Sequence, residues 1–356
     1  MVNKKMLNNI INSILPVLIA LIIGGVVILV IGENPIQTYT VMFGKSIFSI
    51  NGLTNTLHTA SPIILTGLAI AISFKSNLYN MGVEGQFLLG GFVAGLVGAY
   101  IDISNPIIHK ILCILLGGLA GALFALLPAL LRAYFKVDEM VVTLTLNYAL
   151  IILLEYLSSG PFRDSGAGYV ATPVINQTSM FSRIGGTRLT MFFFISISIF
   201  ALFYYLIKRT KFGYVIEVIG KNPDFAEASG LRVRRKIIMI MLISGLLSGI
   251  AGSSHMMSQE FKYTLNFSGT TGVGWDGMLV SLLGGHTPIG VLISSIFYSS
   301  LKTGADNISL YTQIPRDIVS IIQALMIILL SIKILDSKFN WYKKNKNIKE
   351  NIKWHY

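Results

Sequence analysis

Long apolar runs separated by short polar stretches recur from residue 14 to residue 335. A bilayer core about 30 Å thick is crossed by a helix of about 20 mostly apolar residues, and the runs approach that length. Of the 356 residues, 53% are hydrophobic and only 12% are charged, against roughly 25% charged in an average soluble domain. The sequence therefore predicts an all-α integral membrane protein with one continuous membrane domain over residues 14–335.

The predicted membrane domain divides into about ten transmembrane helices. They are placed at residues 14–31, 57–74, 78–100, 111–131, 140–158, 190–207, 237–257, 273–284, 287–302 and 318–335. A short amino-terminal segment (1–13) precedes them, a basic loop (208–236) interrupts them, and a basic tail (336–356) follows.

Positive charge orients the predicted spans. With the amino terminus inside, 20 of the 28 Lys and Arg residues fall in inner segments, eight of them in 208–236 and seven in 333–356. Because inner loops carry an excess of Lys and Arg, we expect a multi-pass protein of the plasma membrane with both termini cytoplasmic. A break at GGHTP (284–288) gives the even number of crossings that this requires. Residues 273–302 form either two crossings or a re-entrant pair.

An internal echo predicts a duplicated design. The run GVEGQFLLGG (82–91) resembles residues 274–285, which begin GWDG and end GG. Each opens the third span of a five-span half, one from the inner face and the other from the outer face. This is the pattern of a 5+5 inverted repeat, although a match this short also arises by chance.

The basic loop contains a helix signal in its middle, GKNPDFAEASG (220–230). Asn222 can cap a short helix with Pro223 at its first position, and Gly230 suits the left-handed residue after its end. About two helical turns are marginal alone in water, so the helix must pack against a surface. That surface is either this protein's own membrane domain, beside anionic lipid, or a separate partner.

Three motifs carry a resemblance to a known family. Residues 220–230, followed by SGLLSGIAG (244–252), resemble the inner loop and next helix of ABC-importer permeases for branched-chain amino acids, simple sugars and nucleosides. The runs NMGVEGQ (80–86) and GWDG (274–277) narrow the resemblance to nucleoside-type permeases that work with a lipoprotein of the basic membrane protein type. It covers roughly residues 57–335, and Met81 departs from the Ile or Val expected there.

The resemblance implies both a coupling element and partners. The short helix would sit in a groove of an ABC ATPase subunit, which binds the ATP, so this chain is expected to hold no cofactor. A second permease chain, often non-identical, and an extracellular solute-binding lipoprotein complete the expected assembly. The implied coupling residues are Gly220, Asn222, Pro223, Ala226, Glu227 and Gly230.

Polar residues inside the predicted spans are candidates for a substrate route. A carboxylate at the bilayer centre costs about 2.5 to 3.5 kcal/mol, so such groups should face protein or water. They either line the route, where they could bond ribose hydroxyls or base edges, or cap helices and join them across the membrane domain. The candidates are Glu84, Gln86, Asn147, Trp275 and Asp276.

Several function classes are excluded or disfavoured. The basic residues lie between spans and in the tail, which argues against nucleic acid. Cys113 is the only cysteine, so a disulfide framework or a cysteine-based metal site is not available. The GxGxxG match at 272–277 lacks a βαβ context, and no convincing HExxH or GxSxG motif is present, so we do not expect an enzyme.

The sequence thus predicts the permease subunit of an ABC importer for a nucleoside or a related solute. A simple sugar, riboflavin or a branched-chain amino acid is an alternative substrate, and an ion-coupled secondary transporter is an alternative class. The predicted outer segment 159–189, with Arg163, Asp164, Arg183 and Arg188, is either a landing surface for the lipoprotein or an ordinary loop.

Overall fold

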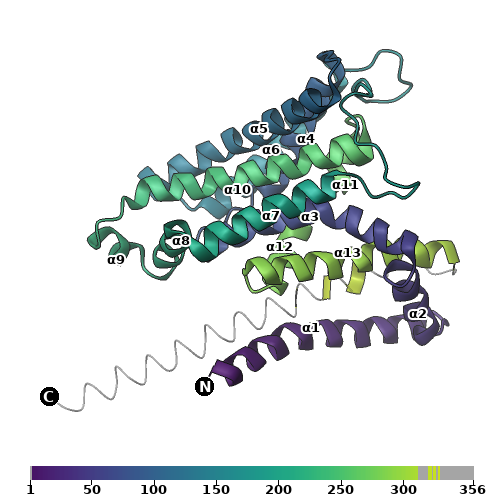
Figure 1. Ribbon diagram of the computed structural model, residues 1–356, viewed down its shortest axis with the longest axis horizontal. Coiled ribbons are helices and arrows are strands. Elements are labelled where there is room, and N and C mark those ends of the chain that lie inside the picture. The colour runs from purple at the N-terminus through teal and green to yellow at the C-terminus, as the bar shows by residue number, and fades with distance from the viewer. Residues whose placement is uncertain (1, 312–319, 323, 326–327, 329–356) are drawn as a thin grey trace. The chain divides into compact units, whose positions relative to one another are not determined.

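The computed structural model describes residues 2–311, 320–322, 324–325 and 328 (Figure 1). Within these residues every regular element is a helix, and β-pairing is limited to two isolated bridges. The chain divides into two compact units, Ser49–Ser300 and Met1–Phe48 with Leu301–Tyr356. The predicted all-α class is confirmed.

The smaller unit contains α1 (Val2–Val30), α2 (Pro35–Ser46) and the end of α13 (Pro288–Tyr311). The α2 helix was not expected from the sequence. Asn34 caps it by accepting a hydrogen bond from the amide of Ile36 at 2.9 Å, with Pro35 at its first position. The hydroxyl of Tyr39 donates to the carbonyl of Leu21 at 2.5 Å and so joins α2 to α1.

The larger unit begins with α3 and ends within α13. Its helices are α3 (Ile50–Lys75), α4 (Val83–Tyr100), α5 (Pro106–Phe135), α6 (Glu139–Ser159), α7 (Phe192–Arg209), α8 (Lys211–Lys221), α9 (Pro223–Ala228), α10 (Val233–His255), the π-helix η1 (Met256–Glu260), α11 (Leu265–Thr270), and α12 (Val273–Leu283), followed by most of α13.

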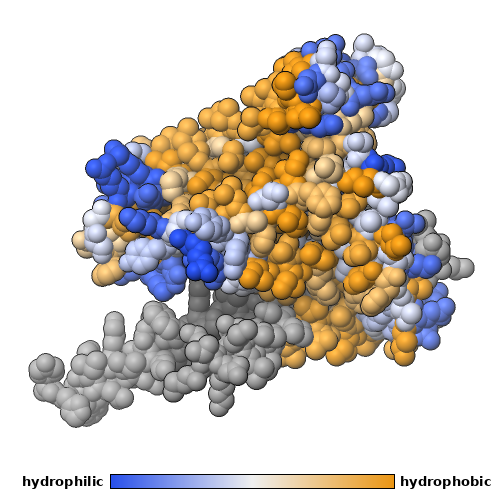
Figure 2. Space-filling model, in the orientation of Figure 1, coloured by the Kyte–Doolittle hydropathy of each residue, from blue (hydrophilic) through white to orange (hydrophobic). Residues whose placement is uncertain are grey.

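Six helices of the described chain are long and apolar enough to cross a membrane: α3, α4, α5, α6, α7 and the continuous stretch Val233–Glu260. Figure 2 shows apolar side chains along the flanks of α5, α7 and α10, with polar side chains at the α8–α9 end and at the opposite end. This distribution is that of a multi-pass membrane protein. The total of ten crossings and the 5+5 repeat stay predictions.

One predicted boundary needs correction and another is confirmed. The span 78–100 is wrong at its start, because residues 76–82 form a loop and α4 begins at Val83. The break at 284–287 is confirmed, since α12 ends at Leu283 and α13 begins at Pro288. The predicted span 318–335 lies mostly outside the described residues.

Glycine allows α4, α5 and α10 to touch through their backbones. A Cβ added to Gly121 would lie 2.4 Å from the carbonyl oxygen of Gly245, and one added to Gly90 would lie 2.5 Å from the Cα of Gly249. A Cβ on Gly252 would lie 1.8 Å from the carbonyl oxygen of Phe87. Small residues therefore pack these three helices together, as is common in membranes.

Candidate functional site

The loop between α3 and α4 is held by polar side chains of α6. Glu139 accepts a hydrogen bond from the amide of Tyr79 at 2.9 Å, and the hydroxyl of Thr143 accepts one from the amide of Met81 at 3.1 Å. The side-chain amide of Asn147 donates to the carbonyl of Met81 at 2.7 Å. These bonds replace the helical bonds that residues 78–82 would otherwise make, which explains why α4 begins late.

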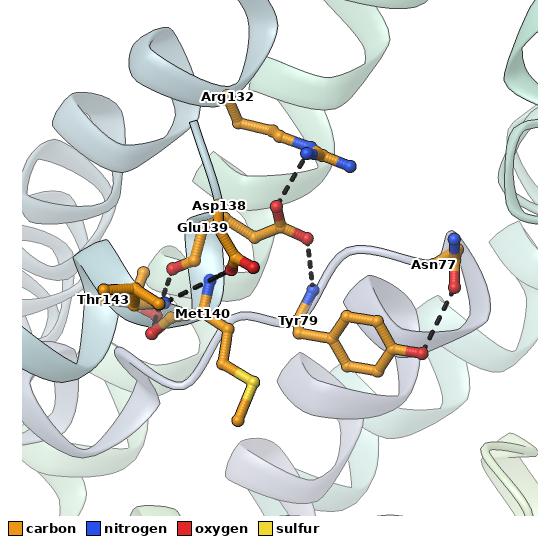
Figure 3. Close-up of polar contacts among 8 residues, drawn as sticks. Asn77, Tyr79, Arg132, Asp138, Glu139, Met140 and Thr143 are labelled. Carbon is orange, nitrogen blue, oxygen red and sulfur yellow. Dashed lines mark hydrogen bonds and ion pairs between the residues drawn. The ribbon is translucent and has the colours of Figure 1, made fainter. Parts of the chain in front are cut away.

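Glu139 lies at the centre of these contacts between α6 and the α3–α4 loop (Figure 3). It is 3% exposed, and its second oxygen lies 3.0 Å from Nε of Arg132. Asp138 next to it caps α6 by accepting from the amide of Met140 at 2.8 Å. Glu139 was not among the site residues predicted from the sequence. The sequence feature that could have identified it is an acidic residue at the predicted inner end of the span 140–158, seven residues after Arg132.

A second polar network lies behind the loop. Asn80 donates to Oε1 of Gln86 at 3.1 Å and to the hydroxyl of Ser244 at 2.9 Å. Ser244 in turn donates to the carbonyl of Ala69 at 2.9 Å. Asn80, Gln86 and Ser244 are fully buried, so the network connects α3, α4 and α10 away from water.

The amino ends of α4 and α12 meet at Glu84. The Glu84 carboxylate accepts from the amide of Gly274 at 2.6 Å and from the hydroxyl of Thr271 at 3.3 Å. A Cβ on Gly274 would lie 2.6 Å from the Cα of Glu84, so only glycine permits this approach. Asn147 accepts from the amide of Gly85 at 3.0 Å. We call this contact between α4 and α12 the junction.

Two further candidates lie in the first turn of α12. The hydroxyl of Tyr298 on α13 donates to Asp276 at 2.5 Å. Trp275 is 42% exposed and Asp276 is partly exposed. The structure therefore brings Glu84, Trp275 and Asp276 to one place. It buries Glu84 among hydrogen-bond donors while Trp275 faces outward.

Gln86 and Asn147 lie beside the junction and are also buried. Both use their amide groups to hold the loop and α4, as described above. This geometry is that of helix caps and cross-helix bonds. A direct contact with a solute stays a prediction for all five candidates.

The short helix predicted in the basic loop is present as α9. Asn222 caps it by accepting from the amide of Phe225 at 2.9 Å, and Pro223 is its first residue. Gly230 adopts the left-handed conformation, with φ of 86°. Ala226 is fully buried and is the only buried residue of the helix, while Phe225 is 60% exposed. The helix therefore rests on the chain by one small face.

The preceding helix α8 contacts the end of α3. A Cβ on Gly220 would lie 2.1 Å from the carbonyl oxygen of Lys75. On the exposed side of α8, Glu217 and Lys221 form an ion pair at 2.9 Å. The hydrogen bond from Lys221 lowers the pKa of Glu217. Glu227, the remaining predicted coupling residue, is exposed on α9.

The segment 159–189 is fastened to the residues after α10 by backbone hydrogen bonds. Amides of Thr172, Ile175 and Phe181 donate to carbonyls of Tyr263, Phe261 and Met257 at 3.0, 2.9 and 2.9 Å. We call residues 171–181 the strap. Of the four charged residues predicted here, Arg163, Arg183 and Arg188 are exposed and Asp164 is partly exposed.

Comparison with known proteins gives a consistent result. Residues 52–331 match the family described as branched-chain amino acid transport system / permease component. The guanosine ABC transporter permease protein NupP of Bacillus subtilis (strain 168) is 29% identical over 332 residues, covering 91% of this chain and 93% of NupP.

Two other relatives show similar coverage. The nucleoside ABC transporter permease protein NupB of Lactococcus lactis subsp. cremoris (strain MG1363) is 29% identical, covering 92% of this chain and 93% of NupB. The glucose ABC transporter permease protein TsgB13 of Haloferax volcanii is 27% identical, covering 89% of this chain and 86% of TsgB13. No solved structure matches significantly.

Proposed function

The chain belongs to the branched-chain amino acid transport system / permease component family, and we propose that it is an ABC-importer permease that passes a nucleoside inward. The proposed substrate is supported by the names of NupP and NupB, each matched over nine-tenths of its length. Glucose import by TsgB13 makes a simple sugar the alternative.

We propose ten crossings arranged as a 5+5 inverted repeat, with both termini cytoplasmic in the plasma membrane. The break at 284–287 supports an even count. The meeting of α4 and α12 supports the repeat, because the two helices carrying the similar motifs approach each other by their amino ends. Discontinuous helices that meet inside a transporter are typical of inverted repeats.

The observation that carries the coupling proposal is α9. It is capped at both ends, buries only Ala226 and leaves Phe225 exposed on a basic loop. Such a helix offers a separate ATPase subunit a preformed surface. We infer that ATP binds to that partner and that this chain needs no cofactor of its own.

A path of direct contacts connects α9 to the junction. Gly220 on α8 lies against Lys75 at the end of α3, and the next residues are the loop 76–82. Displacement of α9 would therefore act on α3 and on the loop that Glu139 anchors. We propose that this movement switches the route between outer and inner access.

In this proposal the residues at the junction shape the route. Glu84, Gln86 and Asn147 hold the helix ends in place, whereas Trp275 and Asp276 are exposed enough to meet a solute. We further propose that a second permease chain completes the importer. An external solute-binding lipoprotein would dock on the exposed arginines of 159–189.

The test replaces residues 222–228 with a flexible Gly/Ser segment. We expect the purified permease to lose capture of its ATPase subunit while the apolar helices stay folded. A control exchanges exposed residues of the outer segment, such as Ser182→Gly, and should retain capture. Full capture by the Gly/Ser variant would remove α9 from the mechanism.

A further inference from the structure

Two neighbouring helices of the larger unit depart from regular α-helical bonding. Pro62 lies inside α3, which continues through it, and α10 changes into the π-helix η1 at Met256. Ser244 of α10 bonds to Ala69 of α3, and eleven residues further along each helix, in opposite directions, stand His255 and His58. This register places the two imidazoles at the same level of the helix pair.

Unpaired polar atoms gather at this level. Among the residues the structure describes, Nδ1 of His58, Nδ1 of His255 and the hydroxyl of Ser254 are buried without a hydrogen-bond partner. Their residues are 8%, 8% and 1% exposed. Because Pro62 has no amide hydrogen, the carbonyl of His58 also loses its usual helical donor. A buried polar group without a partner costs about 1–3 kcal/mol, so a group of them requires an explanation.

Aromatic rings lie around His255. The His255 ring lies 5.6 Å from that of Phe87 and 5.7 Å from that of Phe267, measured between centroids. The Tyr263 ring lies 5.1 Å from that of Phe267. The surroundings of His255 are therefore aromatic, with a few buried polar atoms, a composition that small-molecule sites share.

A partly exposed acid lies beside the cluster. Glu260, at the end of η1, lies 3.4 Å from Nε2 of His255, and its side chain is 35% exposed. The strap runs along η1 and the residues that follow it. The amide of Phe181 donates to the carbonyl of Met257, and the amide of Thr172 donates to that of Tyr263. Lys262 adds a hydrogen bond to the hydroxyl of Tyr169, just before the strap.

We propose that His58, Ser254 and His255 form a nucleoside-binding site between α3 and α10, covered by the strap. The inference rests on the proposed function and names where its solute binds. The imidazole nitrogens and the hydroxyl can bond ribose hydroxyls and base edges. The rings of Phe87 and Phe267 stack on each other, with centroids 5.8 Å apart, and this pair offers an aromatic surface for the base. Transporters commonly bind their solutes where a helix departs from regular bonding and leaves backbone or side-chain groups without partners.

Adjacent serines of α10 give a matched test. Ser254 and Ser253 are both buried, but the hydroxyl of Ser253 donates to the carbonyl of Gly249 at 2.9 Å. Uptake of tritiated guanosine is measured in vesicles containing the permease with its ATPase and partner subunits. We expect Ser254→Ala to raise KM about three- to tenfold, the loss of one hydrogen bond, with unfolding temperature unchanged or higher. Ser253→Ala should leave KM unchanged.

His58→Asn and His255→Gln provide independent variants. Each should raise KM for guanosine, and an excess of unlabelled guanosine should compete where glucose does not. Wild-type KM in Ser254→Ala and in both histidine variants would overturn the site while leaving nucleoside import intact. Absence of guanosine uptake by the wild-type assembly would instead refute the proposed function, and the site with it.

Discussion

Gly274 shows how much one missing methyl group matters at the junction. A Cβ there would meet the Cα and amide nitrogen of Glu84 at 2.6 Å, and both are backbone atoms that cannot rotate away. We expect Gly274→Ala to destabilise the protein by about 1–3 kcal/mol through overpacking. Thermal unfolding of the purified protein in detergent measures this.

Gly269 on α11 supplies the control for that substitution. A Cβ at Gly269 meets nothing within 4 Å, so Gly269→Ala should leave the unfolding temperature nearly unchanged. If the two alanine variants unfolded at the same temperature, the close approach of α4 and α12 would be contradicted.

His286 predicts a dependence of stability on pH. It lies in the turn between α12 and α13, where burial lowers its pKa to about 4 from 6.5. The unfolded chain therefore binds more protons than the folded chain between these values. Stability should fall as the pH drops from 6.5 to 4, by about 3 kcal/mol for this group, and change little from it below pH 4.

His286→Asn isolates that contribution. Asn tolerates the positive φ of 54° found at this position, so the turn should be preserved. We expect the variant to lose less stability than the wild type on acidification, measured as the difference between their unfolding temperatures at pH 7 and pH 4.5. If both proteins lost the same stability between pH 7 and pH 4.5, folding would not lower the pKa of His286.

Local signals at single residues were predictable, and distant pairings were not. Asn222, Pro223 and Gly230 specify a helix start and end within nine residues, and all three are found in those positions. Glu139 bonds to Tyr79, sixty residues away, because the fold brings α6 beside the α3–α4 loop. No periodicity in the sequence encodes that distance.

At the scale of elements, α9 predicts a clear effect of its aromatic residue. Phe225 is 60% exposed and contributes little to packing within the chain. We expect Phe225→Ala to leave the unfolding temperature unchanged while weakening capture of the ATPase subunit at least tenfold, the loss of about 1.4 kcal/mol or more of buried apolar contact. Pull-down at a series of ATPase concentrations measures this.

Phe135, at the end of α5, is the matched control because it is 73% exposed and also lies in a predicted inner segment. Phe135→Ala should bind the ATPase as the wild type does. Equal binding by the Phe225 and Phe135 variants would mean that the exposed face of α9 is not the contact surface.

Helix boundaries were predicted correctly where the local sequence marks them strongly, and incorrectly where it does not. Glycines and Pro288 marked the break after α12, and it is where the sequence placed it. The start of α4 was misplaced because residues 78–82 look compatible with a span. Their amides are instead bound by side chains of α6, which only the tertiary structure supplies.

At the scale of the whole molecule, the proposed topology can be read with single cysteines. Cys113 is the only cysteine and is buried, so Cys113→Ala provides a background without thiols. We expect Ser182→Cys to react with a membrane-impermeant maleimide in intact cells. Ala228→Cys and Ser337→Cys should react only after the membrane is opened.

The tail variant is the most discriminating of the three. Labelling of Ser337→Cys in intact cells would mean an odd number of crossings from a cytoplasmic amino terminus. The break at 284–287 would then belong to a re-entrant element. Labelling of Ala228→Cys in intact cells would reverse the proposed orientation altogether.

The glycine contacts between α4, α5 and α10 constrain how such a carrier can work. Where two helices touch through their backbones, no layer of side chains lies between them that could repack as one helix slides past the other. We therefore expect α4, α5 and α10 to move as one rigid body. A second rigid pair is formed where Gly277 of α12 presses on Thr66 of α3. A movement between these two bodies would have to pass through the junction, where Gly274 of α12 meets the backbone of Glu84 on α4.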